Sequence, residues 1–122
     1  MKAKPFTDNL RHLLFHVNEM FDSDYNGILV NRYENGTKYI GSHSDDESCL
    51  SNNGVVALSF GVTRTFRIRD KMTKKIYLDI PSKSYDFIHM GGDFQKEFLH
   101  EIIKEKKIKD ERISFTFRKH LS

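Results

Sequence analysis

The chain has 122 residues, of which 38% are hydrophobic and 30% are charged, and its formal net charge is +3. This composition is typical of one folded domain and excludes a disordered chain. No apolar run approaches the roughly 20 residues of a membrane helix, and the N-terminus lacks the apolar segment of a signal peptide. The single cysteine, Cys49, excludes an internal disulfide and favours a reducing compartment. We expect one domain over residues 1–122, without a membrane span, in the cytoplasm or nucleus.

Residues 7–21 are predicted to form an amphipathic helix. Thr7 and Asp8 are suitable capping residues, and apolar residues then recur at spacings of three and four.

From residue 28 onward the hydrophobic period changes to that of strands. Turn residues separate the predicted strands, which cover residues 28–33, 38–43, 55–60, 64–69, 76–80, 85–90, 98–103 and 112–118. Turns are expected at 34–36, 71–75, 81–84 and 91–93, and a loop at 47–54. One helix followed by seven or eight short strands predicts a mainly β fold of jelly-roll type.

His43 and Asp45 lie two residues apart on one of these strands. Alternate residues of a strand point to the same side, so the two side chains share a face. With His100 as a third ligand they would form a facial triad of two histidines and one carboxylate, which is typical of non-haem Fe(II) oxygenases. The spacing alone is a weak signal, because such a pair more often occurs by chance.

The strand 112–118 alternates strictly between two kinds of side chain. Arg112, Ser114, Thr116 and Arg118 share one face, and apolar residues occupy the other. The two arginines lie about 20 Å apart between Cα atoms and could bind a short dicarboxylate, because guanidinium pairs bidentately with carboxylate. The alternative is an ordinary strand with a solvated cationic face.

Asn31 and Tyr33 also share a face of their strand. Their amide and phenol are suitable hydrogen-bond partners for a carboxylate, or they are structural polar residues. The basic stretches 64–75 and 104–109 are either solvated surfaces or tracks for phosphate.

Taken together, these motifs resemble the AlkB family of Fe(II)- and 2-oxoglutarate-dependent dioxygenases. The resemblance rests on Asn31-x-Tyr33, on His43-x-Asp45-Asp46-Glu47, on the run from Gly92 to His100, and on Arg112 and Arg118 before Lys119-His120. It implies a double-stranded β-helix in which His43, Asp45 and His100 hold the catalytic iron.

The resemblance also implies the remaining site residues and the reaction. The co-substrate 2-oxoglutarate would be bound by Asn31, Tyr33, Arg112, Ser114 and Arg118. Tyr39, Asp46 and Glu47 would contact the substrate. The expected reaction is oxidative demethylation of 1-methyladenine or 3-methylcytosine in DNA or RNA, with single strands preferred and the enzyme a monomer.

Two departures from the family pattern keep alternatives open. Ser114 stands where many family members have Asn. Only about 30 residues precede Asn31, where relatives have a longer region with a nucleotide-recognition lid. The chain is therefore either a minimal viral or phage-like enzyme or the core of a larger protein. The alternative functions are oxidation of a protein or small molecule, or nucleic-acid binding without catalysis.

Overall fold

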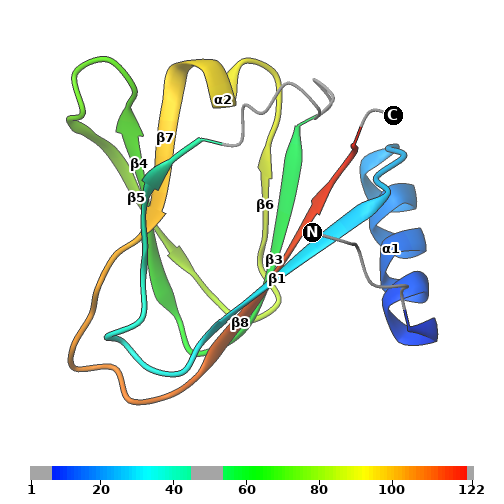
Figure 1. Cartoon of the computed structure of the whole chain (residues 1–122), viewed down its shortest axis with the longest axis horizontal. Coiled ribbons are helices and arrows are strands. Elements are labelled where there is room, and N and C mark those ends of the chain that lie inside the picture. Colours follow the sequence, from blue (N-terminus) through cyan, green and yellow to red (C-terminus); the bar gives the residue numbers. More distant parts are fainter. Residues whose placement is uncertain (1–6, 45–53, 121–122) are drawn as a thin grey trace.

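The computed structural model describes residues 7–44 and 54–120, and they fold into two facing antiparallel sheets flanked by a helix (Figure 1). The sheets have the strand orders β1-β8-β3-β6 and β2-β7-β4-β5. The elements, in chain order, are α1 (Asp8–Phe21), β1 (Gly27–Tyr33), β2 (Ile40–His43), β3 (Val55–Gly61), β4 (Arg64–Asp70), β5 (Ile76–Ser82), β6 (Phe87–Met90), α2 (Phe94–Glu97), β7 (Phe98–Ile102) and β8 (Arg112–Arg118). The predicted mainly β jelly roll with an N-terminal helix is confirmed.

Helix α1 begins and ends with standard capping geometry. The Thr7 hydroxyl accepts a hydrogen bond from the Leu10 N–H at 3.2 Å, and Asp22 adopts the left-handed conformation that ends the helix. The helix covers the outer face of the β1-β8-β3-β6 sheet (Figure 1), where Val17 packs into a cluster with Val56 and Phe117. No helix within residues 7–44 and 54–120 is long and apolar enough to cross a membrane.

The β1-β8-β3-β6 sheet is buried on both faces, and strand β3 shows this most clearly. Val56 and Leu58 pack beneath α1, whereas Val55 and Ala57 point between the sheets. Side chains that alternate along one strand therefore enter two separate cores. This sheet is the central layer of the molecule.

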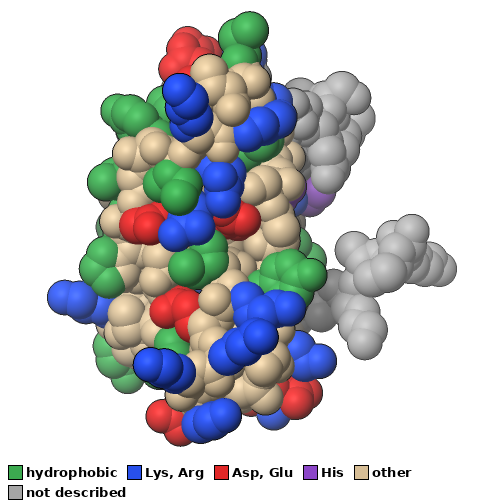
Figure 2. All heavy atoms as spheres, turned by 90° about the vertical axis from the view of Figure 1, so that its left-hand side faces the viewer, with side chains coloured by type: hydrophobic (Ala, Val, Ile, Leu, Met, Phe, Trp, Pro, Cys, Tyr) green, Lys and Arg blue, Asp and Glu red, His purple; other side chains and the backbone are tan. Residues whose placement is uncertain are grey.

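The outer face of the β2-β7-β4-β5 sheet is instead charged and exposed. Figure 2 shows basic and acidic side chains interspersed over it. Arg67 pairs with Asp79 at 2.9 Å, and Arg69 pairs with Glu101 at 2.7 Å. The basic stretch 64–75 is thus partly neutralised by cross-strand partners and does not form a free cationic track.

Two local predictions were wrong. Pro81 was assigned to a turn, but β5 continues through it to Ser82. The strand tolerates proline because β5 is at the edge of its sheet, where a missing N–H leaves no neighbour unpaired. The single-turn helix α2 was not predicted either, because four residues are too short to show a helical period.

Candidate active site

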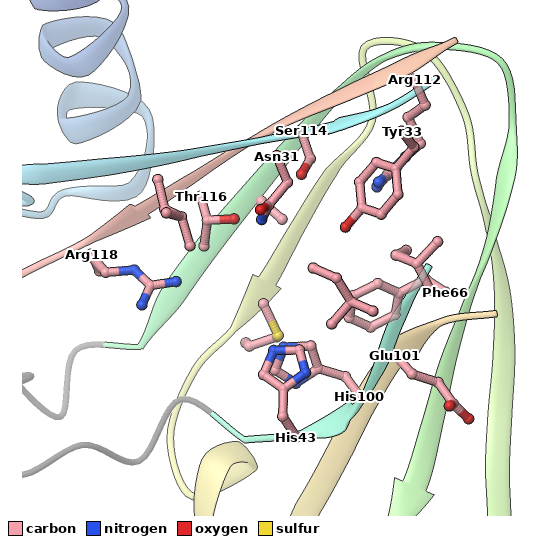
Figure 3. Close-up of a pocket in the computed structure, with 15 residues that line it drawn as sticks. Asn31, Tyr33, His43, Phe66, His100, Glu101, Arg112, Ser114, Thr116 and Arg118 are labelled. Carbon is pink, nitrogen blue, oxygen red and sulfur yellow. The ribbon is translucent and has the colours of Figure 1, made fainter. Parts of the chain in front are cut away.

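A cavity of about 130 Å³ lies between the two sheets, and both contribute polar side chains to it. Seven of the residues singled out from the sequence line it: Asn31, Tyr33, His43, His100, Arg112, Ser114 and Arg118. The two histidines come from the β2-β7-β4-β5 sheet and face the other five across the cavity (Figure 3).

His43 and His100 are direct neighbours on adjacent strands. They are paired in register between β2 and β7, and their ring centroids lie 4.2 Å apart. The His43 Nδ1 lies 2.9 Å from the Gly41 carbonyl oxygen. Because a carbonyl only accepts, this hydrogen bond requires a proton on Nδ1 and leaves the Nε2 lone pair for another partner. An imidazole oriented in this way is suited to bind a transition metal through Nε2.

His100 is held by aromatic packing as well as by its strand. It is buried, and its ring stacks on Phe66 with a centroid separation of 5.5 Å and an angle of 14°. The predicted carboxylate ligand, Asp45, lies outside the described residues, as do Asp46 and Glu47. Among the residues described, no group of three metal-ligating side chains is present. Glu101 borders the cavity, but its carboxylate accepts a hydrogen bond from Arg69.

Arg112 is a buried cation at the end of the cavity away from the histidines, which we call the arginine end (Figure 3). It is 2% exposed, and its Nη2 donates to the Ser59 hydroxyl at 2.8 Å and to the Ser82 hydroxyl at 3.3 Å. Its Nε and Nη1 are buried and have no hydrogen-bond partner within the described part of the chain. Burial lowers the pKa of Arg112 below its ordinary value. A buried guanidinium with unused donors is favourable only when an anion joins it, so this end of the cavity is suited to a carboxylate.

Tyr33 is packed between two arginines. Its ring centroid lies 5.1 Å from the Arg112 guanidinium carbon and 5.6 Å from that of Arg64. Burial raises the pKa of the Tyr33 phenol, and the positive charge of Arg112 opposes that rise. The phenol is therefore neutral near pH 7 and can donate a hydrogen bond to an anion.

The remaining inward residues of β1 and β8 line the floor between these groups. Asn31 lies opposite Ser114 in the strand pairing, and Ser114 and Thr116 are buried between the two arginines of β8. Arg118 is 9% exposed and lies at the other end of the strand (Figure 3). Both faces of β8 are thus covered, and the alternative of a solvated cationic face is wrong.

Tyr39 is the one predicted site residue that the structure describes outside the cavity lining. It is 55% exposed, and the Lys104 ammonium lies 4.7 Å from its ring centroid. Conversely, Ser59 and Ser82 were not predicted, although both contact Arg112. The sequence offered a signal only for Ser59, which interrupts the apolar run of β3. A buried hydroxyl there requires a hydrogen-bond partner, and this partner is Arg112.

The fold and the cavity define a jelly-roll protein with a candidate metal site facing a candidate carboxylate site. The family model described as the 2OG-Fe(II) oxygenase superfamily matches residues 1–118. The chain therefore belongs to this superfamily and, within it, to the AlkB family.

Individual relatives agree with this assignment. Human "DNA oxidative demethylase ALKBH2" is 29% identical over 129 residues, which covers 99% of this chain and 49% of that protein. Human "Alpha-ketoglutarate-dependent dioxygenase alkB homolog 3" is 33% identical over 118 residues, covering 89% and 41%. "Uncharacterized protein R406" of Acanthamoeba polyphaga mimivirus is 27% identical over 120 residues, covering 97% and 62%. The chain spans about half the length of the two human relatives.

A solved structure supports the fold. "The structure of OsALKBH1" superposes with a TM-score of 0.68 at 21% identity, covering 97% of this chain and 66% of that one. Membership of the superfamily implies Fe(II) and 2-oxoglutarate. The residues present fit both, because adjacent imidazoles are suitable metal ligands and the unused Arg112 donors are suited to a carboxylate.

Proposed function

We propose that this chain is an oxidative demethylase that removes N-methyl groups from 1-methyladenine and 3-methylcytosine in DNA or RNA, using Fe(II), dioxygen and 2-oxoglutarate. The observation that carries the proposal is the cavity itself, in which paired imidazoles face two buried arginines across a space the size of a small dicarboxylate. The name of the human ALKBH2 relative, a DNA oxidative demethylase, supports nucleic acid as the substrate.

In this proposal the side chains of β1 and β8 that line the cavity bind the co-substrate. Arg112 pairs with one carboxylate of 2-oxoglutarate through donors that are otherwise unused, and the neutral Tyr33 phenol donates a hydrogen bond nearby. Arg118 binds the carboxylate at the other end, with Asn31 and Ser114 between them. These groups orient the co-substrate and exclude water from it.

The histidine end holds the metal. His43 and His100, together with Asp45, bind Fe(II). When bound, Fe(II) would supply the oxidation of an N-methyl group by dioxygen: one oxygen atom would enter the methyl group, the other would convert 2-oxoglutarate to succinate and CO2, and the hydroxymethyl product would lose formaldehyde.

Substrate selection is assigned to side chains near the metal ligands. Methylation at N1 of adenine or N3 of cytosine makes the base cationic, and the carboxylates of Asp46 and Glu47 would favour that cation over an unmodified base. A base that cannot pair is also easier to extrude, so single strands are the preferred substrate. Tyr39 is proposed as an outer stacking contact, with the protein acting as a monomer.

The test is anaerobic reconstitution with Fe(II) and 2-oxoglutarate, followed by exposure to air with single-stranded oligonucleotides that contain either lesion. Succinate, formaldehyde and repaired base are measured together. All three are expected from the unmodified chain and none from His43→Ala. His89→Ala is the matched control, because His89 is exposed and does not line the cavity. Succinate without repaired base would instead indicate oxidation of a protein or small molecule, and binding without any product would indicate a non-catalytic module.

A further inference from the structure

Strand β2, which carries His43, is weakly anchored in its sheet. It has four residues and lies at the edge, where it pairs with β7 alone among the described strands. The register shifts between the pairs Ile40–Ile102 and His43–His100. Because the backbone ladder is irregular between Ile40 and His43, the ladder alone does not fix the position of His43.

Lys71, immediately after β4, ties this strand end to its surroundings. Its Nζ donates to the Ser44 hydroxyl at 3.1 Å and to the Gln95 carbonyl oxygen at 3.0 Å. Its backbone N–H donates to the Glu97 carbonyl oxygen at 3.0 Å. One half-buried residue therefore connects the end of β2, helix α2 and the end of β4.

These contacts adjoin both chain segments that carry the histidines. Ser44 follows His43 at the end of β2 and precedes Asp45 in the chain, so the hydrogen bond from Lys71 to the Ser44 hydroxyl restrains the backbone next to His43. Helix α2 leads directly into β7, which carries His100. Lys71 thus holds both histidine-bearing segments relative to one another.

We propose that Lys71 is a positioning residue for the metal ligands, acting through Ser44 and α2 without touching the metal or the substrate. The proposal rests on the proposed function, since it takes His43 and His100 as metal ligands. Partners that orient ligands from outside the coordination sphere typically contribute ten- to a hundredfold to metal affinity. A nearby ammonium has the opposite electrostatic effect, because it repels a divalent cation. Removal of the Lys71 ammonium would weaken metal binding if its orienting contacts dominate, and would strengthen metal binding if its repulsion dominates. The direction of the change in metal affinity therefore distinguishes the two effects.

The experiment is a titration of the unmodified chain and its variants with Co(II), in the absence of co-substrate. Calorimetry gives the affinity, and visible absorption reports the coordination of the bound ion. Lys71→Met, which keeps the length of the side chain but removes its donors, is expected to weaken Co(II) binding about tenfold and to alter the absorption spectrum. Lys71→Arg, which keeps a cationic donor, is expected to restore both. Lys75→Met is the matched control: it removes the same charge from the same turn, and no hydrogen bond of its ammonium is present among the described residues.

A double-mutant cycle with Ser44→Ala tests the contact itself. Ser44→Ala is expected to weaken Co(II) binding by the same mechanism, so the double variant should be no weaker than Lys71→Met alone. Ser44→Ala also keeps the proposal testable if Lys71→Met does not fold. Unchanged or tighter Co(II) binding in Lys71→Met, or fully additive effects, would overturn the inference. Co(II) binding by the unmodified chain that His43→Ala leaves intact would instead contradict the proposed function.

Discussion

The two ends of the cavity are built in different ways. At the arginine end, Arg112 is held by two buried serines and by Tyr33, and all of these side chains are at most 3% exposed. At the histidine end, His43 is only half-buried and lies on a short strand with an irregular ladder. The fold therefore fixes the Arg112 side chain through buried contacts, whereas in our proposal the position of His43 depends on individual side-chain contacts such as those of Lys71. Substitutions at the two ends should therefore have different consequences.

The largest expected effect is on stability, with Arg64→Met, next to the arginine end of the cavity, where Arg64 packs against the Tyr33 ring. Arg64 is fully buried and donates to the carbonyl oxygens of Asn35, Lys38 and Ile103 at 2.7–3.2 Å, so it joins the loop after β1 to the loop after β7. Removing the donors leaves several acceptors unsatisfied, each at a cost of about 1–3 kcal/mol. We expect the free energy of unfolding in urea to fall by about 3–5 kcal/mol.

The matched variant for that measurement is Arg67→Met on the exposed face of the same strand. Its ion pair with Asp79 is partly solvated, and such pairs contribute about 0–1 kcal/mol. If Arg64→Met and Arg67→Met lowered the free energy of unfolding equally, the buried contacts of Arg64 with the two loops would contribute no more to stability than an exposed ion pair.

Arg112→Met is expected to separate binding from stability. Loss of the buried guanidinium should weaken 2-oxoglutarate binding about a hundredfold, or about 2.7 kcal/mol. The ligand-free protein should be as stable as the parent or more stable, because a buried cation with unused donors is removed. Calorimetry with 2-oxoglutarate and urea denaturation of the ligand-free chain measure the two quantities. A strong loss of ligand-free stability would contradict the view that Arg112 is held ready for an anion.

Two glycine-to-alanine substitutions compare the packing next to the arginine end with that of strand β2, because each adds a single methyl group. A Cβ on Gly36, in the loop at the arginine end, would lie 1.6 Å from the Glu105 carbonyl oxygen, whereas a Cβ on Gly41 in β2 would meet nothing within 4 Å. Gly36→Ala should therefore reduce the free energy of unfolding by about 1–3 kcal/mol. Gly41→Ala should leave it unchanged or raise it by about 0.4–1 kcal/mol. Thermal and urea denaturation of both variants give the comparison.

The parts of the structure that could be predicted from the sequence are those encoded by local periodicity. The spacing of apolar residues in α1 and the alternation of β8 each determine a face, because each pattern has one geometric solution. His43, Arg112 and Arg118 were singled out by the same local alternation, and His100 was added as a third ligand to complete a triad and by the family resemblance; all four line one cavity. Their proposed roles await the experiments above.

Long-range contacts could not be predicted, because nothing local encodes them. Arg64 lies in a basic stretch and resembles its solvated neighbours in sequence, but the fold buries it against loops 26–41 residues away. The Lys71–Ser44 contact depends in the same way on where β2 and α2 meet. Pro81 was misassigned because its tolerance depends on β5 being an edge strand, which is a property of the sheet order.

The smallest expected effect is the alkaline titration of Tyr33. Burial raises the pKa of its phenol above the ordinary value of 10.0 in the folded chain. Below about pH 10 the phenol is protonated in both the folded and unfolded states, so its contribution to stability is fully present. As the pH rises further, the unfolded chain releases this proton first, and stability is lost as the pH approaches the folded pKa. Tyr33→Phe should therefore remove part of the fall in the free energy of unfolding above pH 10. The difference in phenolate absorbance between parent and variant isolates the ionisation of Tyr33 and should place it above pH 10. Ionisation of Tyr33 at its ordinary pKa of 10.0 would mean that this end of the cavity admits water and is not enclosed.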